Sequence, residues 1–251
     1  GVELAGAIAE LARFGMEKDF RNFDPSVANI LLVQAAPRIL PTFPEVLSRR
    51  AQQSLEQIGV KVLVTSRVQE IDADGVIIDG IRVDSKSVLW AAGVTASPAA
   101  RWLKAEADNA GRVKVTETLA VPNIPNVFAI GDTAASNGWA GKPVPGLAPA
   151  AKQGGAYVAR LITARVLGAP EPRPFVYHHR GSLATIGRKA AVADFGTIKV
   201  SGAFAWWLWG VVHLLFLVGG RNRLAVLLNW SWSYFSFRAS TRLITGTSGE
   251  A

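Results

Sequence analysis

The sequence contains no cysteine, so a disulfide framework, a thiolate metal site and a redox-active dithiol are all excluded. Histidine is also scarce: the three residues are His178, His179 and His213, and their spacing is not that of a zinc site. No block of lysine and arginine marks a nucleic-acid-binding arm. We therefore expect no metal and no nucleic-acid partner, and the mild basic excess, a net charge of +8, favours an anionic membrane surface instead.

The chain also lacks an apolar run long enough to cross a bilayer, which takes about 20 residues. Its most apolar stretch, residues 203–218, has 16 residues with one histidine and no charge. Five of the eight tryptophans follow residue 200, and Arg238 and Arg242 come after them. This composition predicts two short helices that lie in the plane of a membrane surface as an anchor. A buried pair of core helices, an oligomer interface and a spanning hairpin are the alternatives.

A strand followed by a Gly-Asp corner stands at the centre of the chain. The apolar residues 126–130 predict a buried strand that ends at Gly131 and Asp132. In a doubly wound sheet, a carboxylate at such a strand end can accept hydrogen bonds from the ribityl chain of FAD. A helix is predicted from Leu147 to about Leu167, and its first N–H groups can face the same ligand. A plain strand–turn and an alanine-rich packing helix are the other interpretations.

The first residues predict a helix over positions 1–11, with small residues at Ala5, Gly6 and Ala9 that would let it pack close to a sheet. A helix that opens at a glycine is also the second half of a dinucleotide-binding turn, of which Gly1 would be the last glycine. The chain begins with neither an initiator methionine nor a signal peptide, and we expect an N-terminal part of the parent protein to be missing. An ordinary surface helix is the alternative.

A parallel strand buried on both faces is predicted at residues 28–34, a continuous apolar run that ends at Gln34. In a dinucleotide-binding fold the residue at this strand end contacts the adenosine ribose, and an acid there repels a 2′-phosphate. Gln34 is neutral. It would either contact the ribose or be a strand-end amide that faces solvent.

The rest of the chain alternates between short helices and strands. Asp74-Gly75 and Asp79-Gly80 predict the turns of a small antiparallel meander, and Gly93 at a strand end would let a ligand approach the backbone. Beyond a proline-rich linker at residues 168–174 the pattern predicts a β subdomain. A further helix is predicted at 45–58, and strands are predicted at 60–64, 67–71, 76–78, 81–83, 87–93, 113–115, 182–186, 190–194 and 196–200.

Taken together, these segments resemble the type II NADH:quinone oxidoreductases, which are single-subunit alternative NADH dehydrogenases. The similar segments occur in the family's order over nearly the whole chain, and although each is weak alone, the set is specific. They are residues 1–6, 37–41, 90–94, 128–132, 147–153 and 181–188, together with the tryptophan-rich tail through Asn229-Trp230.

The resemblance implies an α/β, Rossmann-type flavoprotein with two dinucleotide-binding domains, whose N-terminal FAD half would be absent from this chain. The chain would then hold four parts, and alone it would be inactive. These parts are an NAD(P)H-binding domain without its start (1–110), the returning segment of the FAD-binding domain (111–170), a β subdomain (171–200) and an amphipathic membrane anchor (201–251).

The implied activity belongs to the respiratory chain and pumps no protons: a hydride passes from NADH to FAD, and two electrons then pass to a membrane quinone. Glu3 would lie near the nicotinamide and the flavin, with a role in proton or quinone chemistry; otherwise it is a first-turn acid favoured by the helix dipole. The implied location is the cytoplasmic face of a bacterial inner membrane, on the lipid bilayer surface, with a homodimer left open. The implied cofactor-binding residues are Gly1, Gln34, Ala92, Gly93, Gly131, Asp132, Leu147 and Ala148, and the quinone pocket would include Pro149 and Gln153.

Two residues depart from the family pattern. Gln34 replaces a common acid, which leaves NADPH open beside NADH, and Pro149 replaces a glutamine that borders the quinone pocket in many relatives. Disulfide reductases and sulfide:quinone oxidoreductases need cysteines beside the flavin, so they do not fit. The remaining rivals are another FAD reductase of the same fold and a membrane-tethered, non-catalytic module.

Overall fold

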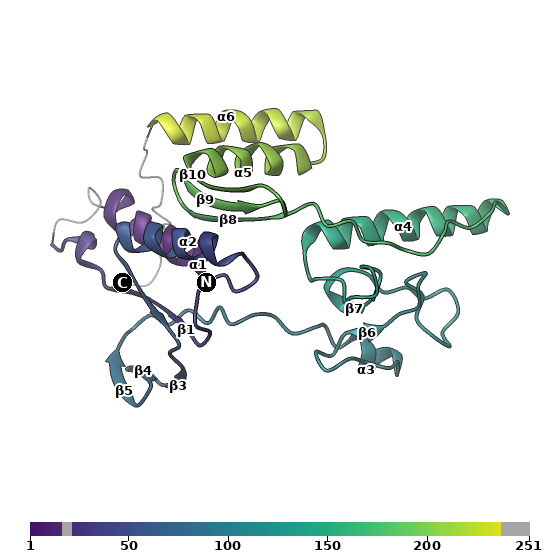
Figure 1. The fold of residues 1–251 in the computed structure, drawn as a ribbon, viewed down its shortest axis with the longest axis horizontal. Coiled ribbons are helices and arrows are strands. Elements are labelled where there is room, and N and C mark those ends of the chain that lie inside the picture. The colour runs from purple at the N-terminus through teal and green to yellow at the C-terminus, as the bar shows by residue number, and fades with distance from the viewer. Residues whose placement is uncertain (17–21, 237–251) are drawn as a thin grey trace, which may run out of the picture. The chain divides into compact units, whose positions relative to one another are not determined.

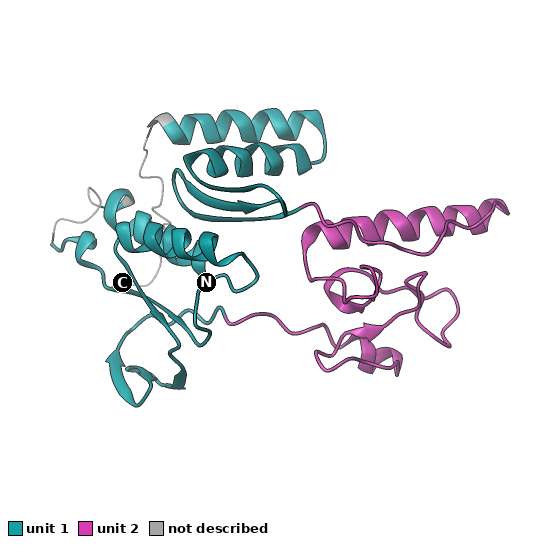
Figure 2. Ribbon diagram, viewed as in Figure 1, with its two compact units in different colours: residues 1–91, 181–251 teal, residues 92–180 magenta. Residues whose placement is uncertain are grey.

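The computed structural model describes residues 1–16 and 22–236 (Figure 1). The chain forms two compact units, one of residues 1–91 with 181–251 and the other of residues 92–180 (Figure 2). The first unit is discontinuous in sequence, because the two ends of the chain share one core. The last part of the predicted anchor, with Arg238 and Arg242, lies outside the described residues.

Helix α1 (Val2–Glu10) opens the first unit and confirms the predicted N-terminal helix. A π-helical turn, η1 (Leu11–Gly15), extends it, and a 3₁₀ turn, η2 (Pro25–Val27), precedes the first strand. The buried face of α1 carries small residues, as the sequence predicts, so the helix axis can come close to its neighbours. That face consists of Val2, Ala5, Gly6 and Ala9.

The predicted parallel β–α–β pattern follows. β1 (Ile30–Gln34) pairs in parallel with β2 (Val60–Val64), and α2 (Glu45–Gln57) crosses between them. The prediction that the first of these strands is buried on both faces is wrong, because all five of its residues are only half-buried. Residues of a strand alternate between its two faces. Ile30 and Leu32, on one face, pack against the core, whereas Leu31 and Val33, on the other face, do not pack against it among the described residues.

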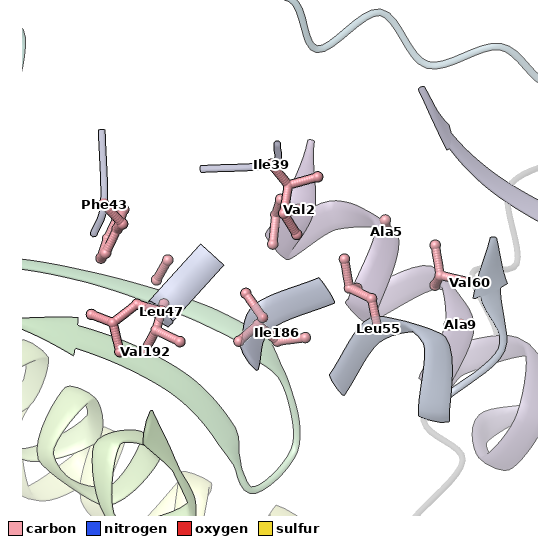
Figure 3. Close-up of a cluster of buried hydrophobic side chains, with 12 residues drawn as sticks. Val2, Ala5, Ala9, Ile39, Phe43, Leu47, Leu55, Val60, Ile186 and Val192 are labelled. Carbon is pink, nitrogen blue, oxygen red and sulfur yellow. The ribbon is translucent and has the colours of Figure 1, made fainter. Parts of the chain in front are cut away.

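The core of the first unit lies between two sheets. Helices α1 and α2 form the middle layer, with the β1–β2 sheet on one side and the C-terminal three-stranded sheet on the other. Ile39 and Phe43, from the proline-punctuated loop before α2, also enter this core. Burying each large apolar side chain stabilises the fold by about 1.5–3 kcal/mol. Figure 3 shows the buried side chains that meet here, among them Val2, Ala5, Ala9, Leu47, Leu55, Val60, Ile186 and Val192.

The C-terminal sheet is an antiparallel meander of β8 (Ser182–Gly187), β9 (Ala190–Asp194) and β10 (Lys199–Gly202), which confirms the predicted β subdomain. The third strand begins later than predicted because Gly196, with φ +84°, lies in the turn that precedes it. Alternate residues of the sheet face opposite layers. Ala184, Ile186 and Val192 join the core around α1 and α2, whereas Leu183, Ala191 and Ala193 pack with the helix on the other face.

That helix is α5 (Ala203–Phe216), which packs on the sheet through the fully buried Ala205. α6 (Gly220–Ser236) lies against α5 (Figure 1). Trp209 of α5 and Trp230 of α6 stack with their ring centroids 5.7 Å apart. Two short helices were predicted, and this is confirmed. Among the described residues, none of the helices combines the length and apolar character that crossing a bilayer requires.

The outer face of α5 is apolar and open to solvent. Phe204, Trp207, Val211 and Leu215 follow one another at helical spacing, and their exposed fractions run from 52% to 68%. None of the described residues covers this face.

The predicted small meander is also present, as β3 (Val68–Ile71), β4 (Gly75–Ile78) and β5 (Ile81–Asp84). The turn between β4 and β5 consists of Asp79 and Gly80, which have φ values of +50° and +81°. Two consecutive positive φ values are what a two-residue hairpin turn requires, and Asp-Gly adopts them readily.

The second unit is built around one long helix. α4 (Ala148–Leu167) matches the predicted helix and buries Tyr157 and Leu161 against the loops before it. The other elements are short. They are α3 (Ala99–Leu103), β6 (Val113–Lys114), the 3₁₀ turn η3 (Gly131–Thr133) and β7 (Ala134–Ala135), with β6 and β7 paired in parallel.

Two predicted buried strands are wrong. Residues 87–93 form no strand, and Trp90 is 69% exposed. Residues 126–130 make one isolated bridge, between Phe128 and Ala120, and Ile130 is 39% exposed. A strand exists only where a neighbour pairs with its N–H and C=O groups. Among the described residues no strand runs beside either segment, so both stay outside any sheet.

Gly6 should not tolerate a methyl group. A Cβ built there would lie 1.6 Å from the carbonyl oxygen of Ile186, which is backbone and cannot rotate away. We expect Gly6→Ala to lower the free energy of unfolding by about 3 kcal/mol or more, measured by denaturant titration. The matched control is Gly210→Ala in α5, where the nearest atom would be 4.0 Å away. Because alanine favours a helix interior over glycine by about 1 kcal/mol, the control should be neutral or stabilised. Equal effects of the two substitutions would contradict the close packing of α1 on β8.

Candidate functional site

Helix α1 starts next to β1. Gly1 is its N-cap residue and, as a glycine, has no side chain that could cap the first N–H groups. A Cβ built on Gly1 would lie 3.4 Å from Leu32 Cδ1 and 3.9 Å from Ala91 Cβ. The helix therefore starts beside β1, where its N–H groups and dipole favour an anionic group such as a pyrophosphate.

Glu3 lies in the first turn of this helix and is held from a distant strand. Its Oε1 accepts hydrogen bonds from the backbone N of Thr185 (2.9 Å) and from Thr185 Oγ1 (3.1 Å). Oε2 makes no hydrogen bond to the residues that the structure describes. Glu3 is exposed as a whole, so the carboxylate is fixed in orientation by one oxygen and can meet a ligand with the other.

Glu10 repeats this arrangement two turns further along α1. Its carboxylate accepts a hydrogen bond from the backbone N of Arg188, at the turn that ends β8. Burial raises the pKa of Glu10, and the hydrogen bond and the positive charge of Arg188 lower it by less. Glu10 therefore holds the other end of α1 on the same strand, although its charge is poorly solvated there.

Gln34 ends β1, two residues after the Leu32 that touches Gly1. Its backbone oxygen accepts a hydrogen bond from Ser66 N (3.1 Å), which fixes the strand end. Residues two apart on a strand share a face, so the Gln34 side chain and Leu32 lie on the same side of β1. The first unit thus places Gly1 and the end of β1, with Gln34, on one side of the start of α1, and the Glu3 carboxylate at β8 on its other side.

The second unit brings together the Gly-Asp corner and the start of α4. Gly131 has φ +61°, and a Cβ built on Gly146 would lie 3.2 Å from Asp132 Oδ1. Asp132 is exposed, and its carboxylate makes no hydrogen bond to the described residues. Leu147 is the N-cap of α4 and supplies no side-chain cap. The N–H groups of Leu147, Ala150 and Ala151 already donate to backbone oxygens, and Pro149 has none. The N–H of Ala148 therefore remains without a partner among the described residues.

Gln153, one turn beyond Pro149, is already engaged. Its Nε2 donates to the carbonyl oxygen of His178 and its Oε1 accepts from the N–H of His178, both at 2.9 Å. The side-chain amide therefore pairs with the backbone of the extended segment 172–180 as a strand would. Gln153 lies on the same face of α4 as Pro149, but its Nε2 and Oε1 atoms are both hydrogen-bonded to the backbone of His178.

Ala92 and Gly93 are not gathered with the other predicted residues. Both are exposed, and nothing lies within 4 Å of a Cβ built on Gly93. Because the strand predicted to carry them is absent, no secondary structure holds their position. The predicted residues thus form one group in each unit. Ala92 and Gly93 belong to neither group.

The structure adds residues that the sequence analysis missed. Thr185 and Arg188 orient Glu3 and Glu10, yet neither type suggests that role. One signal was present. Glu3 and Glu10 are seven residues apart, which places both on one face of a helix and about 10 Å apart along its axis. Thr185 and Arg188, three residues apart in extended chain, are separated by about the same length. Only the fold brings together residues 182 positions apart.

The chain is similar to known proteins over most of its length. Residues 1–155 match the family model described as pyridine nucleotide-disulphide oxidoreductase, and residues 179–239 match the NDH2 C-terminal domain. The chain is 40% identical to the type II NADH:quinone oxidoreductase Ndh of Mycobacterium tuberculosis, over 98% of this chain and 54% of that protein. It is 31% identical to an internal alternative NAD(P)H-ubiquinone oxidoreductase of Arabidopsis thaliana, over 97% of this chain and 51% of that protein.

Among solved structures, NDH2 from Plasmodium falciparum in complex with NADH superposes with a TM-score of 0.79 at 19% identity, over 94% of this chain and 64% of that chain. This likeness shows a common fold. The chain spans about half the length of the curated relatives that it matches.

The buried carboxylate of Glu10 gives a test by pH. A raised pKa means that the folded state favours the protonated form, so this group's contribution to stability is lost as pH rises through its folded pKa. Glu10→Gln keeps an acceptor for Arg188 N without the charge. We expect the melting temperature of the variant, relative to that of the wild type, to rise between pH 5 and pH 8. The difference between the two proteins should shrink toward pH 5. A gap that is constant with pH would contradict a poorly solvated Glu10.

Proposed function

The chain belongs to the pyridine nucleotide-disulphide oxidoreductase family, and from that premise we propose that it forms the NADH-binding and membrane-side part of a type II NADH:quinone oxidoreductase. The observation that carries the proposal is the carboxylate of Asp132, which makes no hydrogen bond to the described residues, next to Gly146 and the start of α4, where the N–H of Ala148 has no described partner. A hydroxyl-rich chain that ends in a pyrophosphate, as in FAD, satisfies both groups at once.

The residues of the second unit fit FAD. Asp132 would accept hydrogen bonds from ribityl hydroxyls, and the N–H of Ala148 would face the pyrophosphate or the ring. The N–H of Leu147 donates to the Pro145 carbonyl oxygen (2.9 Å), so this residue would line the site without donating to the ligand. Gly131 and Gly146 carry no side chain where the backbone and Asp132 come close, so the ligand can reach them. When bound, the flavin would accept a hydride from the nicotinamide and pass two electrons to a quinone.

The residues of the first unit fit NADH. The start of α1 would bind the pyrophosphate through backbone N–H groups, and Gly1 leaves room for its approach. Glu3, held by Thr185, would keep a carboxylate at a fixed place near the nicotinamide, where it can accept or return a proton. Gln34 would donate to the adenosine ribose without the charge that repels a 2′-phosphate, so NADPH is a second substrate class.

The quinone would meet the α4 face that carries Pro149 and Gln153. Because the Gln153 amide is paired with His178, its part would be to hold segment 172–180 as a wall and not to bind the quinone oxygen directly. The exposed apolar face of α5 would rest on the bilayer from which the quinone comes.

The wider assignments follow the same proposal. Residues 1–110 would be the NADH domain, 111–170 the returning FAD segment, 171–200 the β subdomain and 201–251 the anchor. The enzyme would be peripheral on the cytoplasmic face of a bacterial inner membrane and pump no protons. A homodimer is compatible with the exposed aromatic helices.

The test is the visible spectrum of the complete protein that contains this chain. We expect flavin bands that NADH bleaches and a short-chain quinone restores. Asp132→Ala should lose bound flavin, whereas Asp79→Ala, at an exposed hairpin turn, should keep it. A colourless protein would favour the non-catalytic module, and bleaching without reoxidation by quinone would favour another FAD reductase of this fold.

The membrane contact is tested on the outer face of α5. Replacing Trp207 and Leu215, which are 56% and 61% exposed, with glutamate should release the protein from vesicles that contain anionic lipid. The Trp207 ring also lies 5.7 Å from the Tyr234 ring of α6, centroid to centroid, so circular dichroism must first show that the fold of the double variant survives. The control is Ile81→Glu, at an equally exposed apolar residue in the β3–β5 meander. Sedimentation of the double variant with vesicles at the wild-type level would contradict the anchor.

A further inference from the structure

A groove in the second unit lies next to the face proposed to meet the quinone and shares Gln153 and segment 172–180 with it. It runs between α4 and the extended segment 172–180 and has a volume of about 520 Å³. Its polar lining includes Gln153, Tyr157, Arg160, Arg173, His178 and Arg180, and no acidic residue lines it.

The three arginines in the lining carry the first part of the argument. Arg160, Arg173 and Arg180 are exposed, and none of them makes an ion pair with the residues that the structure describes. Three unpaired guanidinium groups around one groove repel one another, so an anion that binds between them relieves this repulsion. Guanidinium groups match phosphate oxygens in pairs, which makes arginine a preferred phosphate ligand.

Tyr157 supplies an independent observation. Its side chain is 3% exposed, yet its hydroxyl makes no hydrogen bond within the described part of the chain. Burial raises the pKa of Tyr157, and Glu171 raises it further, while Arg165 and Arg160 lower it. The hydroxyl therefore stays protonated at neutral pH. A buried hydroxyl without a partner costs stability, so a ligand oxygen that accepts from it would remove that cost.

The walls of the groove are held in place before any ligand arrives. Gln153 joins α4 to the backbone of His178, and Pro172 and Pro174 restrict the backbone on either side of Arg173. The nearby acid, Glu171, is paired with Arg165 (2.9 Å) and so does not neutralise the three arginines. A preformed groove loses little entropy when it binds.

We propose that this groove binds a phosphate group of an organic ligand, with Arg160, Arg173 and Arg180 around the phosphate oxygens and the Tyr157 hydroxyl as a further donor. The phosphate belongs either to a lipid headgroup or to a free phosphorylated metabolite. The site is separate from the Gly-Asp corner, and its existence does not depend on the redox chemistry.

The experiment uses the complete protein with its cofactor, in saturating NAD⁺ so that the nucleotide site is filled. The free source is probed with glycerol 3-phosphate, and the readout is the rise in melting temperature, since a ligand that binds the folded state stabilises it. The lipid source is probed by sedimentation with phosphatidylglycerol vesicles against phosphatidylcholine vesicles. We expect one of the two probes to bind.

Three variants decide the outcome. In the double variant Arg160→Gln and Arg173→Gln, affinity for the binding probe should fall about tenfold or more, while Arg101→Gln, an exposed arginine of α3 outside the groove, should bind as the wild type does. Tyr157→Phe removes only the hydroxyl. It should weaken binding and leave the melting temperature without ligand unchanged or higher.

Two results would overturn the proposal. One is that the double arginine variant binds each probe as tightly as the Arg101→Gln variant does. The other is a lower melting temperature of Tyr157→Phe without ligand, because the hydroxyl would then have a protein partner in the complete molecule. Circular dichroism of the arginine variants separates lost binding from lost folding.

Discussion

The contact of α1 with β8 is the constraint on which the first unit depends. Gly6 lies so close to the carbonyl of Ile186 that no side chain fits between them. Glu3 and Glu10 bind backbone N–H groups of β8 on either side of this contact, at Thr185 and at the following turn. A shift of the helix by one residue along the strand would break both bonds and force a side chain into the carbonyl. The position of the α1 N-terminus, and with it the proposed NADH site, is therefore set by a strand from the other end of the sequence.

The same turn also fixes the aromatic helices. The backbone of Arg188 binds Glu10, while its guanidinium group donates to the carbonyl oxygens of Ser233 (2.8 Å) and Tyr234 (3.2 Å). These carbonyls lie in the last turn of α6, where intrahelical partners run out and a cation is favoured. One residue thus connects the helix of the proposed NADH site to the outer helix of the proposed anchor. The orientation of the anchor and the orientation of the nucleotide helix are parts of one hydrogen-bonded arrangement.

The sequence predicted the helices and turns whose formation depends on residues only a few positions apart. The glycine-led helix, the crossover around Glu45–Gln57, the Asp79-Gly80 turn and the aromatic helices all follow from spacing and turn residues a few positions apart. The candidate residues of each unit were also named from sequence, because glycines and acids at strand ends and helix starts are recognisable. What failed was strand formation at 87–93 and 126–130, which depends on a neighbouring strand and not on the apolar run itself. The bonds that orient Glu3 were equally out of reach, since nothing in a threonine 182 positions away marks it as a partner.

The unsatisfied groups of the chain are of two kinds, and they need different partners. One face of β1, with Leu31 and Val33, presents half-buried apolar side chains, which another strand or helix covers best. The starts of α1 and α4 present N–H groups beside glycines, several in α1 and that of Ala148 in α4, and none of the described residues supplies a capping side chain. An anion fits those positions, and a dinucleotide brings a pyrophosphate to each. Asp132 adds a carboxylate that a pyrophosphate alone would repel but that hydroxyl groups next to it would satisfy. Helix N-termini bind anions, and the Asp132 carboxylate accepts hydrogen bonds from hydroxyl groups. The two features together are therefore a stronger argument for FAD and NADH than either feature alone.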